Sequence, residues 1–482
     1  MPSMSRERFL QEYELNLDLE FQCGKTTASW APRASRPLYW GEEQQNSFKL
    51  AQGDPNRSNV PNAKLGVSSD YKFVSVATNA VIRIYEVDTR RQTAELKAHM
   101  TNIWKFHFTE ARASEAKYWL ISEGAMVSGC DGDIVVWHLD RDGHVLHHNA
   151  VPFAIRYLTD KAVDAIEQDL KRHHELDISA IESIGSSFAN TLERVDLENR
   201  LQYLPHLDGH LPSFGSHYFS HEGNRFIYIV HGMTTQNAMW SPNDLPQVVV
   251  FDMVKMVEVF RLKGHTDAIM WASWSPNDRA IVTASWDETH KIWSATKGEC
   301  KHTIGPTGGQ NWAGCFIDDH RVLLSGGTPT RLSIYSIATA KELCRLELEE
   351  PQIKHWIRHF TWNPKFNTFA LIINKSIVLW QLDEKQSESM KCEVLKVKND
   401  GSMLDRFCNL SDIQWLDDGK KLIVRVNEGK MMVWDWERNF KWRFQRPKGT
   451  KLHYGGGFAY LPNSQILLCL DRDGTVREWS LN

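Results

Sequence analysis

The chain has 482 residues, of which 42% are hydrophobic and 24% are charged, a balance typical of a folded protein with a large apolar core. Its formal net charge of −4 gives no electrostatic reason to expect binding to nucleic acid or to an anionic membrane. The eight cysteines form no CxxC pair, which indicates reduced thiols in the cytoplasm or the nucleus.

The first 45 residues are predicted to be an N-terminal extension. The segment RERFLQEYELNLDLEF has the spacing of a short amphipathic helix. Its apolar face could bind a partner or dock on the rest of the chain. The start contains no apolar core of a secretory signal, and no later run approaches the roughly 18 apolar residues of a membrane span. We therefore expect no membrane association.

Residues 46–482 repeat one pattern, an apolar strand that ends in an aromatic residue. The distance from Trp293 to Tyr335 is 42 residues, and from Trp434 to Trp479 it is 45. Alternating apolar runs bounded by turn residues predict β-strands. The eight aromatic residues that close these strands are Tyr85, Trp137, Phe251, Trp293, Tyr335, Trp380, Trp434 and Trp479.

The segment from Gly264 to Trp293, GHTDAIMWASWSPNDRAIVTASWDETHKIW, is the most complete repeat. It combines a Gly-His pair, a Ser-Pro-Asn-Asp turn, an acidic turn residue and a Trp. The polar side chains that we group in this repeat are His265, Ser285, Asp287 and Trp293, and those in the second repeat are His99, Asp131 and Trp137.

This pattern resembles the WD repeat of β-propellers, a family whose blades recur about every 40–45 residues. The resemblance implies an all-β propeller of eight blades, or of seven if the first or third repeat is misread. It also implies that the grouped His, Asp, hydroxyl and indole form a structural network between blades. A catalytic His and Asp would be the functional alternative. We favour the structural interpretation because the pair lies inside a repeat.

Residues 150–210 interrupt the strand pattern. Apolar residues follow three- and four-residue steps and predict helices: Ile178, Ile181, Ile184, Phe188, Leu192 and Val195. We expect this helical insertion to join the outer strand of blade two to the inner strand of blade three, on the top face of the ring. The stripe either packs on the propeller or frames a partner site.

The segment 46–50 is predicted to complete blade eight. The chain ends three residues after Trp479, so the last repeat lacks its outermost strand. An unpaired strand edge invites aggregation, and NSFKL has the length and alternation needed to cover it.

Partner contacts are expected on the top face. Most of the candidates are Trp or Arg, which often dominate the binding energy of protein interfaces. Four candidates occupy matching positions at the start of inner strands: Trp104, Met270, Trp312 and Arg358. Trp286 and Arg472 precede turn acids, and Trp240 lies in the enlarged loop 233–246. The structural alternative to partner binding is that several of these Trp residues are buried between blades.

The resemblance implies a non-catalytic scaffold that binds other proteins through the top face and the helical insertion, as a subunit of a complex. No Walker loop, GxSxG or dinucleotide fingerprint suggests an enzyme, and no cofactor, metal or small-molecule substrate is expected. Five histidines could form a metal site, but we favour the interpretation that they are ordinary loop residues: His144, His147, His148, His206 and His210.

Two alternatives remain for the function. Residues 438–451 interleave basic and aromatic side chains, a combination that can bind RNA. An outer edge strand protected by charge explains the same strip. A substrate receptor of a ubiquitin ligase is less favoured, because the sequence Trp434-Asp435-Trp436-Glu437 has Glu where such receptors carry Arg.

Overall fold

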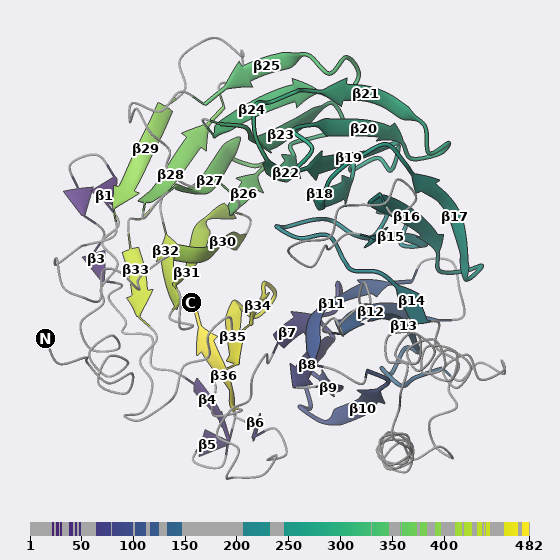
Figure 1. Cartoon of the computed structure of the whole chain (residues 1–482). Coiled ribbons are helices and arrows are strands. Elements are labelled where there is room, and N and C mark those ends of the chain that lie inside the picture. Colours follow the sequence, from purple (N-terminus) through teal and green to yellow (C-terminus); the bar gives the residue numbers. More distant parts are fainter. Residues whose placement is uncertain are drawn as a thin grey trace, which may run out of the picture.

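The computed structural model describes six short strands before residue 50 and most of the chain after residue 63. The described residues are 64–78, 80–99, 102–111, 116–124, 133–146, 206–231, 245–328, 330–346, 357, 359–373, 376–382, 391–396, 410–416, 419–426, 431–435, 438, 440–443, 457–470 and 475–481. All regular elements in these ranges are strands. Eight antiparallel sheets of the described part follow one another around a ring, and we call them blades one to eight (Figure 1).

The first four blades each contribute an inner edge near the centre of the ring and an outer strand at its rim (Figure 1). Blade one consists of β7 (Lys64–Val67), β8 (Phe73–Thr78), β9 (Val81–Glu86) and β10 (Gln92–Lys97). Blade two consists of β11 (Ile103–Glu110), β12 (Tyr118–Gly124), β13 (Asp133–Leu139) and β14 (His206–Asp208). Blade three consists of β15 (Arg225–Val230), β16 (Gln247–Asp252) and β17 (Val257–Leu262). Blade four consists of β18 (Ile269–Trp274), β19 (Ala280–Ser285), β20 (His290–Ser294) and β21 (Cys300–Ile304).

The last four blades follow the same order. Blade five consists of β22 (Asn311–Phe316), β23 (Arg321–Gly326), β24 (Arg331–Ser336) and β25 (Glu342–Arg345). Blade six consists of β26 (Phe360–Asn363), β27 (Thr368–Ile373), β28 (Ser376–Gln381) and β29 (Lys391–Lys396). Blade seven consists of β30 (Leu410–Leu416), β31 (Lys421–Val426), β32 (Met431–Asp435) and β33 (Phe440–Arg443). Blade eight begins with β34 (Phe458–Leu461), β35 (Ile466–Leu470) and β36 (Thr475–Ser480).

Local turn chemistry explains how consecutive strands fold back on each other. In blade four the Ser275 hydroxyl accepts the Ala280 N–H at 2.9 Å, and the Asn277 carboxamide oxygen accepts the Arg279 N–H at 3.0 Å. Asp278 has a φ of 56°, a left-handed conformation that Asp tolerates better than most residues. The Ser-Pro-Asn-Asp sequence therefore forms the turn between β18 and β19.

The hydrophobic core lies between neighbouring blades. The cluster between blades three and four joins Ile227 and Val250 to Trp274 and Trp293, and all four side chains are buried. Each sheet buries both faces in this way, so its central strands are apolar on both sides. Strand β19, for example, is buried along its whole length.

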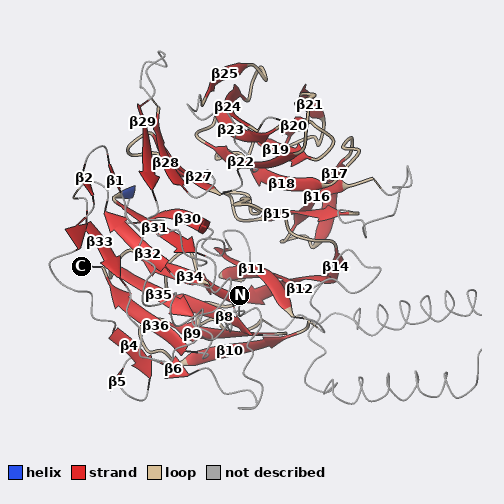
Figure 2. Ribbon diagram, turned by 60° about the vertical axis from the view of Figure 1, so that its left-hand side comes forward, coloured by secondary structure: helices blue, strands red, loops and turns tan. Residues whose placement is uncertain are grey.

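Strands from the beginning of the chain complete the last two blades. Strand β6 (Phe48–Lys49) pairs with β36, which confirms the predicted closure of blade eight. Strand β4 (Leu38–Gly41) also pairs with β36 and carries β5 (Gln44–Gln45) (Figure 2). Strand β3 (Ser29–Trp30) runs parallel to β33 of blade seven. The remaining hairpin is formed by β1 (Gln22–Cys23) and β2 (Thr26–Thr27). The strands of the ring thus extend into the first 45 residues, beyond the boundary expected at residue 46.

The outer strand of blade two is divided by the insertion. Its first part is the bridge between Val145 and Leu139. Its second part is β14, in which His206 pairs with Val135. The prediction that the insertion joins blade two to blade three is therefore wrong, because residues 206–208 still belong to blade two. The predicted helices of the insertion lie outside the described residues.

Candidate functional site

The predicted His, Asp and Trp of blade four lie together. His265 Nδ1 is 2.7 Å from Asp287 Oδ2, and His265 Nε2 is 2.6 Å from Thr283 Oγ1. The Trp293 indole N–H donates to the same Thr283 hydroxyl at 3.0 Å. The network therefore fixes the connection that enters blade four from blade three.

The hydroxyl of this network belongs to Thr283 and not to Ser285, which corrects the sequence-based assignment. Strand pairing sets Ile281 opposite Trp293, so Thr283, two residues further along the same face, lies within reach of the indole. Ser285 lies at the end of the strand. Its hydroxyl donates to the Asp267 carbonyl at 2.8 Å and accepts the Asp287 N–H at 3.1 Å.

The charge state of the network suits a structural role. Burial lowers the pKa of His265 below its ordinary value, although Asp287 opposes the shift. Burial by itself raises the pKa of Asp287, but hydrogen bonds from His265, Thr289 and the Thr266 N–H outweigh it and hold the pKa well below the usual range. Thr283 is fully buried. A substrate therefore has no access to the hydroxyl that is hydrogen-bonded to His265 Nε2.

Blade two contains the same network with different partners from those expected. His99 Nδ1 is 3.0 Å from Asp133 Oδ2, and His99 Nε2 is 2.6 Å from Ser122 Oγ. The Trp137 indole N–H donates to Ser122 Oγ at 2.7 Å. The acid is thus Asp133. Asp131, the predicted acid, lies outside the described residues.

Strand register shows which blades can form this network. Each closing aromatic residue pairs with a residue of the second strand of its blade. The residue two positions after that partner is described and buried in every blade. It carries a Ser or Thr hydroxyl in blades two and four. In the other six blades it is occupied by Val76, Tyr228, Leu324, Leu371, Val424 and Cys469.

Three of the predicted contact residues share a backbone feature. Trp104, Met270 and Trp312 are each the second residue of an inner strand. In each case the pairing register shifts across that residue, which marks a β-bulge. Bulges re-aim side chains and occur often beside functional sites. Trp104 is 52% exposed, whereas Trp312 is 6% exposed and does not fit the expectation of a free contact residue.

Trp312 is covered by two aromatic rings. Its ring centroid lies 5.0 Å from that of Trp286 and 5.9 Å from that of Phe214. We call Phe214, Trp286 and Trp312 the inner-rim aromatic cluster. Trp286 was expected from the sequence, but Phe214 was not. Its signal was the sequence LPSFGS, in which Pro212 and Gly215 exclude a regular strand around the Phe.

A lysine of blade two anchors the segment that carries Phe214. Lys105 Nζ donates to the carbonyl oxygens of Leu211 at 2.7 Å and Pro212 at 3.3 Å. The Leu211 N–H donates to the Glu123 carboxylate at 2.9 Å. Burial lowers the pKa of Lys105, and the nearby Glu123 carboxylate opposes that shift. The segment also joins blade four, because the Ser213 N–H donates to the Met270 carbonyl at 3.0 Å.

The remaining predicted residues lie mostly outside the described part of the chain. Trp240, Arg358 and Arg472 lie outside the described residues. Of the strip 438–451, the structure describes Arg438, which is exposed, and strand β33. Within the described ranges no three His, Cys, Asp or Glu side chains are grouped so that they could hold a metal ion. In the same ranges no helix has the length and apolar character needed to cross a membrane.

Comparison with known proteins agrees with the repeat pattern. Residues 256–294, from the end of blade three through the third strand of blade four, match the family described as WD domain, G-beta repeat. A designed protein, Ika8, has a crystal structure that covers 90% of this chain and 98% of its own, with 12% sequence identity and a TM-score of 0.52. That similarity concerns the fold alone.

Several curated proteins are similar over part of the chain. The small ribosomal subunit protein RACK1 of Drosophila melanogaster is 33% identical over 174 residues, which is 36% of this chain and 52% of that protein. The corresponding protein RACK1y of Oryza sativa subsp. japonica is 25% identical over 175 residues, covering 36% and 49%. Protein tipD of Dictyostelium discoideum is 22% identical over 270 residues, covering 48% and 43%. The chain thus spans about half the length of the curated relatives it matches. The repeat match, the relatives and the eight sheets agree, and they identify residues 256–294 as a WD repeat within a ring of repeated sheets.

Proposed function

We propose that this protein is a non-catalytic scaffold that binds other proteins through the inner rim of its propeller, as a subunit of an assembly in the cytoplasm or the nucleus. The observation that carries the proposal is the set of bulges at the start of the inner strands. They place Trp104, Met270 and Trp312 at equivalent positions around the centre of the ring.

The inner rim has the chemistry of a protein interface. Trp104 leaves about half of a large aromatic side chain exposed, and Met270 is partly exposed nearby in the ring. Trp286 and Trp312 pack against each other, and Phe214 packs against Trp312, so the cluster is rigid before a partner arrives. Rigid aromatic anchors bind with a small loss of conformational entropy.

The decisive experiment compares partner recovery by the parent chain with that by a Trp104→Ala variant. The tagged full chain is purified from cells, and bound proteins are quantified by mass spectrometry. We expect at least one major partner to fall about tenfold or more in the Trp104→Ala variant. The melting temperature should change little, because substitutions at exposed sites alter stability by about 0.5 kcal/mol or less.

Tyr71→Ala is the matched control. Tyr71 is also an exposed aromatic residue, at 37%, but it lies in the turn between β7 and β8 and not at the start of an inner strand. This variant should keep the partners of the parent. Equal recovery with Trp104→Ala and the parent would contradict the inner-rim proposal.

A ribonucleoprotein role is the second candidate, and the names of the relatives favour it. Two are called small ribosomal subunit proteins, and a 43-residue match of 44% identity, covering 9% of this chain and 10% of the other, is to the ribosome biogenesis protein WDR12 homolog of Brugia malayi. The basic and aromatic strip 438–451 would supply the RNA contacts. Strand β33, within this strip, has β3 beside it, so the two strands pair through their backbones.

Ribonuclease treatment separates the two candidates. Partners retained after treatment and at high salt support direct protein binding. Partners lost after treatment, and also lost in a Lys441→Gln, Arg443→Gln double variant, would place the RNA-bound role first.

A further inference from the structure

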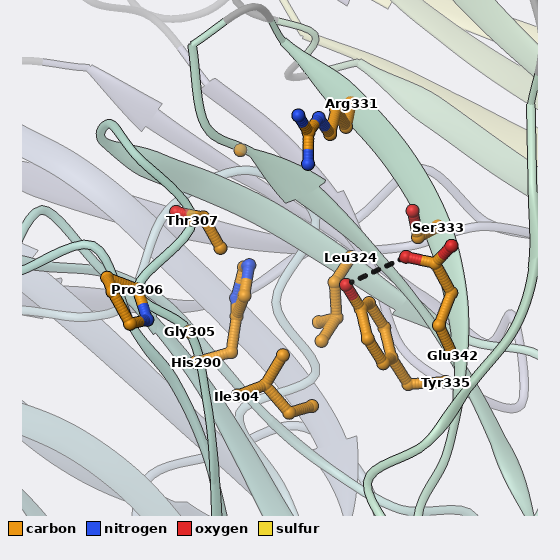
Figure 3. Close-up of a pocket in the computed structure, with 11 residues that line it drawn as sticks. His290, Ile304, Gly305, Pro306, Thr307, Leu324, Arg331, Ser333, Tyr335 and Glu342 are labelled. Carbon is orange, nitrogen blue, oxygen red and sulfur yellow. Dashed lines mark hydrogen bonds between the residues drawn. The ribbon is translucent and has the colours of Figure 1, made fainter.

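A pocket of about 240 Å³ lies between blade four and blade five (Figure 3). No residue of the inner-rim aromatic cluster lines it. Blade four contributes the start of β20 and the end of β21 with the residues that follow it. Blade five contributes β23, β24 and β25. The side chains that line the pocket and matter below are His290, Ile304, Leu324, Arg331, Tyr335 and Glu342.

His290 is an exception among the repeats of this chain. It lies three residues before the closing aromatic of blade four, in a position that is 2% exposed. The other seven blades fill the same buried position with an apolar side chain: Ile82, Ile134, Val248, Leu332, Ile377, Met431 and Val476. An imidazole has therefore replaced a core residue at one place in the ring, and that place borders a pocket.

One nitrogen of the imidazole lacks a hydrogen-bond partner in the part of the chain that the structure describes. Among the described residues, Nδ1 of His290 is buried and has no hydrogen-bond partner. Burial lowers the pKa of His290 to about 3, so the ring is neutral at physiological pH and carries one N–H donor. A buried polar atom without a partner destabilises the fold, and in a native structure it calls for an explanation. Figure 3 shows the ring directed into the pocket, where a ligand could supply the missing partner.

The charges at the pocket favour an anionic ligand. Glu342 is already neutralised by Arg345, whose guanidinium lies 2.9 Å away, and it accepts the Tyr335 hydroxyl at 3.4 Å. Arg331 is exposed and forms no ion pair with the described part of the chain. The guanidinium of Arg331 is thus the charge left for a ligand, and Arg binds carboxylates well through paired N–H donors.

The apolar part of the pocket limits the size of the ligand. Ile304 and Leu324 are buried aliphatic walls, and the half-buried Tyr335 ring lies beside Leu324 (Figure 3). These walls suit a short aliphatic stem that ends in a charged group. The volume suits one side chain rather than a nucleotide or a large cofactor.

We propose that this pocket binds the glutamate side chain of a peptide segment in a partner protein, with the stem against Ile304 and Leu324 and the carboxylate held by Arg331 and His290. The pocket is a second contact surface of the ring. It is separate from the inner rim, so either surface can bind a partner without the other.

The test measures binding of a blocked amino acid to the full chain by ligand-observed NMR. The probe is N-acetylglutamate N-methylamide, and the comparison ligand is N-acetylglutamine N-methylamide, which has the same shape without the charge. We expect the glutamate probe to bind about tenfold or more tightly than the glutamine probe, as expected for a charge-assisted hydrogen bond. Arg331→Gln should remove this preference. Lys301→Gln, an exposed cation on β21 that does not line the pocket, should retain it.

The His290→Ile variant tests the imidazole by two measurements with opposite signs. Restoring an aliphatic residue should raise the melting temperature, because it removes a buried polar atom without a partner. It should also weaken the glutamate probe by about tenfold. If His290→Ile fails to fold, His290→Gln, which retains an N–H donor, should keep binding.

Equal binding of the two probes, or undiminished binding by His290→Ile, would overturn the proposal. Failure of the inner-rim proposal is distinguishable, because Trp104→Ala would then keep its partners whatever the probes do at this pocket.

Discussion

Blades four and six place their closing tryptophans in the same register but surround them with different side chains. Trp293 lies opposite Ile281, and Trp380 lies opposite Phe369. Two residues further on, blade four has Thr283, which accepts the Trp293 indole N–H at 3.0 Å. Blade six has Leu371 at the equivalent place, and Leu371 is fully buried.

The difference shows that the repeat requires burial at this position and does not require a hydroxyl. In blade six the side chain contributes apolar contacts, whose strength follows the area buried. In blade four it contributes directional bonds that also fix His265 and the connection between two blades. Because the two kinds of contact respond differently to substitution and to pH, each can be disrupted separately.

The largest effect is expected from Leu371→Ala in blade six. It removes buried methyl groups and leaves a cavity among Phe369, Trp380 and their neighbours. Such substitutions cost about 2–5 kcal/mol. Urea denaturation should show a lower midpoint with little dependence on pH. A loss below about 1 kcal/mol would mean that blade six contributes little to the stability of the ring.

A smaller loss is expected from Thr283→Val in blade four. The side chain keeps its shape, but the His265 ring and the Trp293 indole lose their shared partner while they stay buried. Leaving buried polar groups unpaired costs about 1–3 kcal/mol. Thr303→Val on the exposed strand β21 is the control, and it should lie within about 0.5 kcal/mol of the parent. Equal midpoints for the two variants would show that the network does not stabilise blade four.

The smallest effect, per pH unit, is the contribution that His290 of blade four makes to the pH dependence of stability. The unfolded chain protonates His290 near its ordinary pKa of 6.5, but the folded chain holds that pKa at about 3. The unfolded state therefore binds more protons between these values, and stability falls as the pH decreases below 6.5, by about 1 kcal/mol per pH unit. His290→Ile should give a shallower slope of melting temperature against pH. Leu371→Ala should lower the melting temperature without changing that slope.

Much of the fold followed from the aromatic residues that close each third strand. All eight, from Tyr85 to Trp479, lie in strands of separate sheets, because a short apolar run bounded by turn residues favours a strand that is buried on both faces. The closing strand at residues 46–50 was predictable for a similar reason, since the ring has an unpaired edge without it.

The polar partners were harder to predict because loop length varies. Ser122 is fifteen residues before Trp137, whereas Thr283 is ten residues before Trp293, although both occupy the same register position. A fixed distance from the Trp therefore cannot identify the hydroxyl in both blades. Phe214 was missed for another reason. Its position depends on the contacts that Lys105 makes with Leu211 and Pro212. Both residues are more than 100 positions away from Lys105 in the sequence.

The pairing of β6 with β36 has a consequence for synthesis on the ribosome. Lys49 emerges more than 400 residues before its partner Thr475. At about 5–20 residues per second, this interval is roughly 20–90 s. During that time β6 has no partner, and blade one has no neighbour on one side. The growing chain must therefore keep an open edge from pairing with other nascent chains until its last strand has been translated.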